Sequence, residues 1–261
     1  MLASSTSFPS ISQTIPPDAS SAYLPFCPHP NGNVYVSRIS DLWTDTQGFI
    51  ARDDKKKEIV VVLRGSVSIQ NYITDISIFL TPLVVRGVIE KEPARVHSGF
   101  LNAWNAVATS TIKAIRDELA QHPGYSIVVS GHSLGGALAS LAGISLKRAF
   151  PSVPLRVFTY GQPRTGNEDY ALLLNKEIGT RNLYRGVHTW DGVPTIIPTA
   201  AGYRHHGTEY WSTVDPVTPE NTRACDPNGE DLSCSAQIFS TGINPPHTVY
   251  YNILAGTPYC I

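Results

Sequence analysis

Short apolar runs and a charged segment organise the first third of the chain. The run Glu58–Leu63 is rich in valine and predicts a buried strand, and two shorter strand-like segments precede it at Val34–Ser37 and Gly48–Arg52. The charged segment Asp53–Lys57 predicts a hairpin turn. These residues therefore predict a hairpin that leads into a buried strand.

Helical spacing begins at Ser98. Apolar residues recur every three or four positions over Ser98–Gln121, which predicts an amphipathic helix ended by His122-Pro123-Gly124. The pattern then predicts strands at Tyr125–Val129, Leu155–Tyr160 and Asn182–Thr189 and a helix at Leu134–Phe150. Strands that alternate with helices favour an α/β fold with a mainly parallel sheet.

Composition narrows the class of protein. The 261 residues are 42% hydrophobic and 16% charged, which excludes a disordered chain. A net charge of -1 gives no electrostatic footprint for nucleic acid, and no run of 18 apolar residues predicts a transmembrane segment. The Ser-, Thr- and Pro-rich N-terminus does not resemble an intact signal peptide. We expect an irregular segment over residues 1–26 and a single domain over 27–261.

The motif with the clearest chemistry is SIVVSGHSLGGALASL, which contains G-x-S-x-G at Gly131–Gly135. It lies between a predicted strand and a predicted helix, the context in which this motif presents a nucleophilic serine. Ser133 must then sit on a tight turn, where a side chain at either flanking glycine would collide with the neighbouring strand or helix. The alternative is a chance match to a short pattern.

A serine nucleophile needs a base and an acid, and in this type of fold the acid precedes the base along the chain. Asp191 directly follows a predicted strand and precedes a Gly-Val-Pro turn, so we favour it as the acid over a turn or cap aspartate. The other acidic residues weighed for this role are Glu168, Asp169, Asp215, Asp226 and Asp231.

Chain order also limits the base. It excludes His188 and every histidine before Ser133, and leaves His205, His206 and His247. A late loop histidine suits the role, which favours His247 while His205 and His206 stay open.

Two backbone N–H groups are needed for an oxyanion hole. Leu134 offers one, and Ser66, at the end of the strand VVLRGS, offers the other unless that segment is an ordinary turn. Next to Ser66, a short amphipathic helix is predicted that could form a lid at a lipid surface; the alternative is an ordinary helix or strand packed in the core. The residues that we assign to this lid are Ile69, Tyr72, Ile73, Ile76, Phe79 and Leu80.

Four cysteines, Cys27, Cys225, Cys234 and Cys260, allow three disulfide pairings. An even number fits two disulfides in a secreted protein, and Cys225 and Cys234 flank a turn-rich segment that could close a short loop. Four buried thiols are the alternative. Zinc is not indicated, because no C-x-x-C spacing is present.

Several separate motifs, spread from about Cys27 to Cys260, together resemble the fungal class 3 lipases, which include triacylglycerol lipases and type-A feruloyl esterases. The segments that carry the resemblance are LRGSVSIQNYI, VHSGFLNAW, GHSLGG, FTYGQPRTGN, HTWDGVPTIIP, GYRHHGTEYW and PPHTVYY. The resemblance implies an α/β-hydrolase fold with a central, mainly parallel sheet, helices on both faces and a short helical lid.

Residue roles are implied in the same way. Ser133 matches the nucleophile, Asp191 the acid and His247 the base, while His205 matches a noncatalytic histidine. Ser66 and Leu134 match the oxyanion positions. The cysteines match an arrangement of Cys27–Cys260 and Cys225–Cys234.

We therefore expect a secreted serine ester hydrolase that cleaves lipid esters through an acyl-enzyme on Ser133, with no metal or organic cofactor. Its partners would be a lipid or other ester substrate and a transient lipid–water interface, with no nucleic acid and no obligate protein partner. A feruloyl or general carboxylesterase is the first alternative, although the apolar lid segment argues for lipid. A noncatalytic lipid-binding protein of the same fold is the second.

Overall fold

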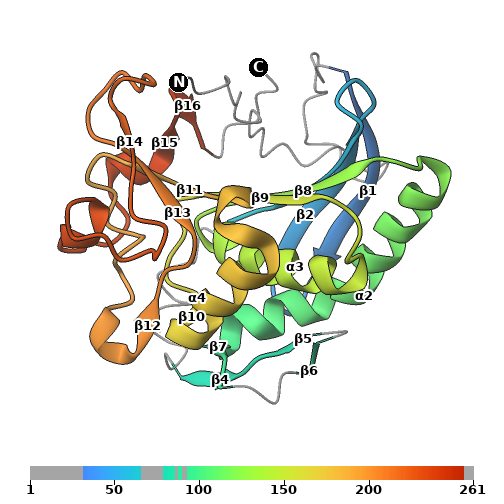
Figure 1. Ribbon diagram of the computed structural model, residues 1–261, viewed down its shortest axis with the longest axis horizontal. Coiled ribbons are helices and arrows are strands. Elements are labelled where there is room, and N and C mark those ends of the chain that lie inside the picture. The colour runs from blue at the N-terminus through green and yellow to red at the C-terminus, as the bar shows by residue number, and fades with distance from the viewer. Residues whose placement is uncertain (1–31, 66–78, 86–87, 90–92, 256–261) are drawn as a thin grey trace.

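An eight-stranded sheet forms the centre of the molecule in a computed structural model that describes residues 32–65, 79–85, 88–89 and 93–255 (Figure 1). In sheet order its strands are β1 (Asn33–Asp41), β2 (Thr46–Asp53), β3 (Glu58–Leu63), β8 (Ser126–His132), β9 (Leu155–Tyr160), β11 (Leu183–His188), β13 (Thr208–Ser212) and β14 (Thr222–Ala224). The five strands from β3 to β13 are parallel, and the outer pairings are antiparallel. This mainly parallel sheet confirms the predicted fold class.

Two long helices, α2 (Ser98–Gln121) and α3 (Leu134–Ala149), lie side by side against one face of the sheet (Figure 1). Their buried apolar residues fill the space between them and the strands, and the Trp104 indole of α2 donates to Ser145 Oγ of α3 at 2.8 Å. The expectation of helices on the opposite face of this sheet stays a prediction. None of the helices in the described ranges has the length and hydropathy needed to span a membrane.

The start of α2 explains the histidine of the VHSGF motif. His97 is fully buried, and its Nδ1 accepts hydrogen bonds from the N–H groups of Gly99 and Phe100, at 3.1 and 3.4 Å. Burial lowers the pKa of His97 to about 4, so the ring stays neutral and keeps this lone pair available. The histidine of VHSGF therefore caps the helix.

Smaller elements surround the main sheet. A second, four-stranded sheet contains β12 (Tyr203–Arg204), β10 (Gly166–Asn167), β7 (Arg95–His97) and β4 (Leu80–Pro82). Two further two-stranded sheets consist of β5 (Val84–Val85) with β6 (Val88–Ile89) and of β15 (Val249–Tyr250) with β16 (Ile253–Leu254). The helix α4 (Glu168–Leu174) continues into a π-helical turn at Asn175–Gly179.

The prediction that the lid helix extends to Leu80 is wrong. Leu80 lies in strand β4, where it pairs with His97, and the carbonyl of Phe79 accepts a hydrogen bond from Ser98 N. Ladder pairing with β7 holds this backbone extended, which overrides the helical spacing of the apolar residues. The other predicted lid residues, Ile69, Tyr72, Ile73 and Ile76, lie outside the described residues, so the lid stays a prediction.

Parallel pairing places the candidate chemistry along one edge of the sheet. Leu63 at the end of β3 pairs with Gly131 of β8, and His132 pairs with Tyr160 at the end of β9. The segments that follow these strands and β11 therefore leave the sheet at the same edge. This is the edge at which parallel α/β sheets bind their ligands.

Candidate active site

The turn at Ser133 is as tight as the motif requires. Ser133 has φ 59° and ψ -128°, an uncommon conformation for a residue with a side chain, and its N–H donates to the carbonyl of Tyr160 at 2.8 Å. A Cβ at Gly131 would lie 2.0 Å from the carbonyl oxygen of Gly135, and one at Gly135 would lie 2.1 Å from that of Leu63. The predicted collisions at both flanking glycines are therefore confirmed.

A continuous chain of hydrogen bonds joins the three residues that the sequence selected. His247 Nε2 lies 2.8 Å from Ser133 Oγ, and His247 Nδ1 lies 2.8 Å from Asp191 Oδ2. Asp191 is fully buried, and Ser133 and His247 are 3% and 4% exposed. This geometry lets the imidazole take a proton from the serine hydroxyl while the carboxylate fixes its tautomer.

The carboxylate of Asp191 has further donors. Val193 N donates to Oδ1 at 2.8 Å, and the Tyr250 hydroxyl donates to Oδ2, the oxygen that also faces His247. Burial, with the Asp191 charge as the next cause, raises the pKa of Tyr250 well above its usual value, so the phenol keeps its proton. Sequence reasoning missed Tyr250; its place in PPHTVYY, three residues after His247, was the available signal.

His132, next to the nucleophile in the motif, supports the backbone of the base. Its ring centroid lies 4.5 Å from that of His247, and its Nε2 lies 2.7 Å from the carbonyl oxygen of His247. Burial, followed by the proximity of His247, lowers the pKa of His132 to about 3. The ring is therefore neutral, and Nε2 must carry its proton to donate to this carbonyl.

A third glycine shapes the site from the side of β9. Gly161 has φ +56°, and a Cβ on it would lie 2.7 Å from Asp191 Oδ2 and 2.8 Å from the His247 ring. The acid–base pair thus packs against bare backbone. The sequence signal for this contact was the segment FTYGQPRTGN.

The oxyanion side is described in part. Leu134 is buried at the first position of α3, where an N–H has no partner within the helix. A Cβ at Gly65 would lie 3.1 Å from Ser133 Cβ, so the chain passes against the nucleophile one residue before Ser66. Ser66 itself lies outside the described residues, and its role stays a prediction.

The other two candidate bases lie elsewhere. His205 Nε2 contacts the carbonyl oxygen of Pro194 at 2.9 Å, and His206 Nε2 contacts the Gln162 amide at 3.1 and 3.2 Å. Both rings are buried, and neither is hydrogen-bonded to Ser133 within the described part of the chain. Of the three histidines left open by chain order, the structure brings His247 to the serine.

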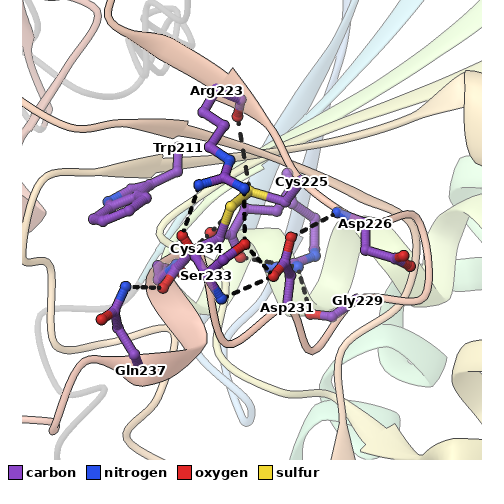
Figure 2. Close-up of a disulfide and its surroundings, with 12 residues drawn as sticks. Trp211, Arg223, Cys225, Asp226, Gly229, Asp231, Ser233, Cys234 and Gln237 are labelled. Atoms are coloured by element: carbon purple, nitrogen blue, oxygen red, sulfur yellow. Dashed lines mark hydrogen bonds and ion pairs between the residues drawn. A yellow bond between two sulfur atoms is a disulfide. The ribbon is translucent and has the colours of Figure 1, made fainter.

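Cys225 and Cys234 form the predicted disulfide, which closes a short loop beside β13 and β14 (Figure 2). Inside this loop, Asp231 Oδ2 accepts a hydrogen bond from Asp226 N at 3.0 Å. Glu209 and the two sulfur atoms form the candidate metal-binding group of the described residues, but these sulfurs are bonded to each other and are not thiolate ligands. Cys27 and Cys260 lie outside the described residues, so their pairing stays a prediction.

Comparison with known proteins supports the same chemistry. Residues 60–201 match the family described as Lipase (class 3). The chain is 33% identical over 226 residues to a secreted alkaline triacylglycerol lipase from Penicillium cyclopium, covering 86% of this chain and 77% of that lipase. It is 34% identical over 232 residues to a lipase from Rhizopus niveus, covering 87% of this chain and 56% of that lipase.

A solved structure gives a third comparison. It is a triacylglycerol lipase described as having a catalytic centre formed by a serine protease triad. The two chains superpose with a TM-score of 0.77 at 32% identity, covering 86% of this chain and 83% of the other.

Proposed function

This chain belongs to the class 3 lipase family, and we propose that it is a secreted serine hydrolase that cleaves acylglycerol esters through an acyl-enzyme on Ser133. The observation that carries the proposal is the buried chain of hydrogen bonds from Ser133 through His247 to Asp191. The names of the relatives, among them a secreted triacylglycerol lipase and a secreted mono- and diacylglycerol lipase, favour the lipid substrate and the extracellular location.

In the acylation half, Ser133 Oγ attacks the ester carbonyl carbon while its proton moves to His247 Nε2. The carbonyl π electrons move to oxygen, and the resulting oxyanion is held by the N–H of Leu134 and by that of Ser66. When the intermediate collapses, the C–O bond to the alcohol breaks and the imidazolium returns its proton to the leaving alkoxide oxygen. The products of this half are the free alcohol and the acyl-serine ester.

In the second half, water attacks the acyl-serine and gives its proton to His247, which passes it to Ser133 Oγ as the acid leaves. Asp191 remains ionised throughout and stabilises each imidazolium as it forms. Tyr250 donates to the carboxylate oxygen that faces His247, and so keeps this oxygen aimed at Nδ1. The mechanism uses no metal and no organic cofactor.

Exposed apolar side chains at the catalytic edge support a lipid surface as the source of substrate. Leu42 and Trp43, which are 92% and 96% exposed, occupy the turn between β1 and β2. Asp41 Oδ1 orders this turn by accepting hydrogen bonds from Thr44 N and Thr44 Oγ1, at 2.9 and 2.8 Å. Since the start of β2 pairs with the end of β3, the turn lies at the edge of the sheet that carries Ser133.

More apolar side chains lie on the opposite side of the same edge. Trp190, beside Asp191, is 54% exposed, and Phe239 is 88% exposed on a loop whose Ser240 Oγ donates to the carbonyl of Gly192 at 2.6 Å. Exposing this much apolar area to water is unfavourable, whereas contact with a lipid surface would bury it. We propose that these residues meet the lipid–water interface during substrate capture.

A rate panel tests the substrate class. Triacylglycerol emulsion, monoacylglycerol, soluble p-nitrophenyl esters and methyl ferulate are compared, with Ser133→Ala as the blank. We expect acylglycerols to give the highest kcat/KM; a clear preference for methyl ferulate would replace the lipid assignment by a feruloyl esterase. The interface is tested by Trp43→Ser, which should slow emulsion hydrolysis but not that of the soluble ester. Leu232→Ser, at a side chain 76% exposed in the disulfide loop, is the matched control.

A further inference from the structure

His188 is a buried histidine that the proposed reaction does not use. It is the last residue of β11, and its side chain is 4% exposed. Its Nδ1 lies 3.0 Å from the carbonyl oxygen of Pro246, and its Nε2 lies 2.8 Å from Asp215 Oδ1. Pro246 directly precedes the base, so the His188 ring connects the loop of His247 to the loop after β13.

The partners of this ring determine how many protons it holds. A peptide carbonyl only accepts hydrogen bonds, and so does an ionised carboxylate, whereas a neutral imidazole has a single N–H. Both contacts of His188 are therefore satisfied together when both ring nitrogens are protonated.

Several titratable groups lie on the described elements that pack against the His188 ring. The titratable groups on the elements packed against it are Asp215 after β13, Asp191 after β11, Tyr250 on β15 and His247 on the 3₁₀ turn Pro245–Thr248. Two of these are carboxylates. Tyr250, whose ring centroid lies 5.8 Å from that of His188, retains its proton.

We propose that His188 is a positioning residue that donates a hydrogen bond to the Pro246 carbonyl and thereby keeps His247 against Ser133. The inference rests on the proposed function, in which His247 is the base. Two successive carbonyls of the base loop then have imidazole donors: His188 binds that of Pro246, and His132 binds that of His247. Pro246 has no N–H, so its backbone can be held only through its carbonyl. The base loop therefore depends on a hydrogen-bond donor to this carbonyl.

Loss of the proton from His188 has a defined consequence. The remaining N–H stays with Asp215, since a hydrogen bond to a carboxylate is stronger than one to a neutral carbonyl. The lone pair on Nδ1 then faces the Pro246 oxygen, and the clamp opens.

Two substitutions separate the two contacts of the ring. The amide nitrogen of asparagine occupies the place of Nδ1, and that of glutamine occupies the place of Nε2. His188→Asn keeps the donor to Pro246, so its kcat on a soluble ester should stay close to wild type. His188→Gln keeps the contact to Asp215 alone and should lower kcat by about 10- to 100-fold through misplacement of the base. Equal kcat in the two variants, with both folded, would overturn the clamp.

The protonation state is measured directly by nitrogen NMR of the full chain labelled on histidine. We expect Nδ1 of His188 to carry a proton in folded wild type, because Nδ1 donates to the Pro246 carbonyl. An unprotonated Nδ1 in wild-type His188 would refute the proposal. This readout needs no turnover, so an inactive wild-type protein would refute the ester hydrolase assignment without deciding the state of His188.

Discussion

Two clusters of buried charge in this molecule are built in opposite ways. At the active site, Asp191 accepts hydrogen bonds from a backbone N–H, a phenol and a histidine, and His247 is its ion-pair partner among the described residues. Under the disulfide loop, two arginines face two glutamates, which we call the arginine–glutamate cluster: Arg164, Arg185, Glu209 and Glu230.

The arginine–glutamate cluster is fully paired. Arg164 donates to both oxygens of Glu230, at 2.8 and 2.7 Å. Arg185 is 1% exposed and donates to Glu209 Oε2 at 3.2 Å and to the carbonyl of Gly229 at 3.1 Å. Since Gly229 and Glu230 lie between the two cysteines, these bonds fix the disulfide loop to Arg185 on β11 and to Arg164 in the segment after β9. Here charge is neutralised in place and supports structure.

At the active site the carboxylate accepts hydrogen bonds from Val193, Tyr250 and His247, and no guanidinium of the described residues is paired with it. An arginine there would already neutralise Asp191 and reduce its attraction for the imidazolium that forms on His247. A buried anion without a fixed cation is therefore suited to stabilise a charge that appears during the reaction. Substitutions in the first cluster should therefore change rates, and substitutions in the second should change stability.

The largest effect is expected from Asp191→Asn. The amide keeps the shape but favours the wrong imidazole tautomer, so kcat should fall by about 10⁴-fold with little change in thermal stability. Steady-state kinetics on a soluble ester, paired with a thermal melt, measures both. A variant that loses its fold instead of its rate would place Asp191 with the structural charges.

Next in size is Arg185→Met. It leaves Glu209, which is 2% exposed, without its cation, and should lower the free energy of unfolding by about 3–5 kcal/mol. The double variant Arg185→Met/Glu209→Leu removes both charges and should recover much of this loss. Denaturant unfolding measures the two variants, and kcat of the folded fraction should remain near wild type. A loss of rate without a loss of stability would reverse the assignment.

The disulfide should contribute less than the ion pair that it lies beside. Cys225 and Cys234 are separated by 9 positions, and closing so short a loop constrains the unfolded chain by roughly 2–3 kcal/mol. Cys225→Ser/Cys234→Ser should lower the unfolding free energy by about that amount while activity at moderate temperature is retained. If the loss exceeded that of Arg185→Met, the loop would be held mainly by its covalent bond.

The smallest effect is expected in the dependence of the unfolding free energy on acid pH. Burial, followed by the charge of Arg185, lowers the pKa of His206 to about 3, whereas an unfolded histidine titrates near 6.5. Between these values the unfolded chain binds the extra proton, so stability falls as pH falls, by about 1.4 kcal/mol per pH unit for this histidine. His206→Asn should flatten the dependence of unfolding free energy on pH between 6 and 4 by up to roughly that slope. An unchanged slope would mean that His206 is charged in the fold.

The local pattern of the sequence predicted most of the regular elements around the site. The strands Glu58–Leu63 and Leu155–Tyr160 and the helix Ser98–Gln121 have the predicted bounds, because their patterns are long and uniform. The strand β13 was missed as a strand, since its residues alternate less clearly and its position depends on pairing with β11. Leu80 was placed in a helix because its spacing was read without the ladder to β7.

The site was predictable where chemistry follows chain order and not where it follows packing. Ser133 and Asp191 stand beside strand ends, so motif and order point to them. The choice of His247 over His205 needed the resemblance, because both are loop histidines and spatial proximity separates them. Tyr250, Gly161 and His188 act through contacts between segments that are far apart in the sequence. The motifs PPHTVYY and FTYGQPRTGN mark the first two residues, but no local pattern shows which residues these contacts join.

The central claim is that His247 and Asp191 activate Ser133 as a nucleophile. A fluorophosphonate probe followed by peptide mass mapping tests it most directly, with the rate of labelling compared between wild type, Ser133→Ala and His247→Asn. We expect one label per wild-type chain, on Ser133, none on Ser133→Ala, and strongly slowed labelling of folded His247→Asn. A folded wild-type protein that is not labelled, or that is labelled at another residue, would contradict it.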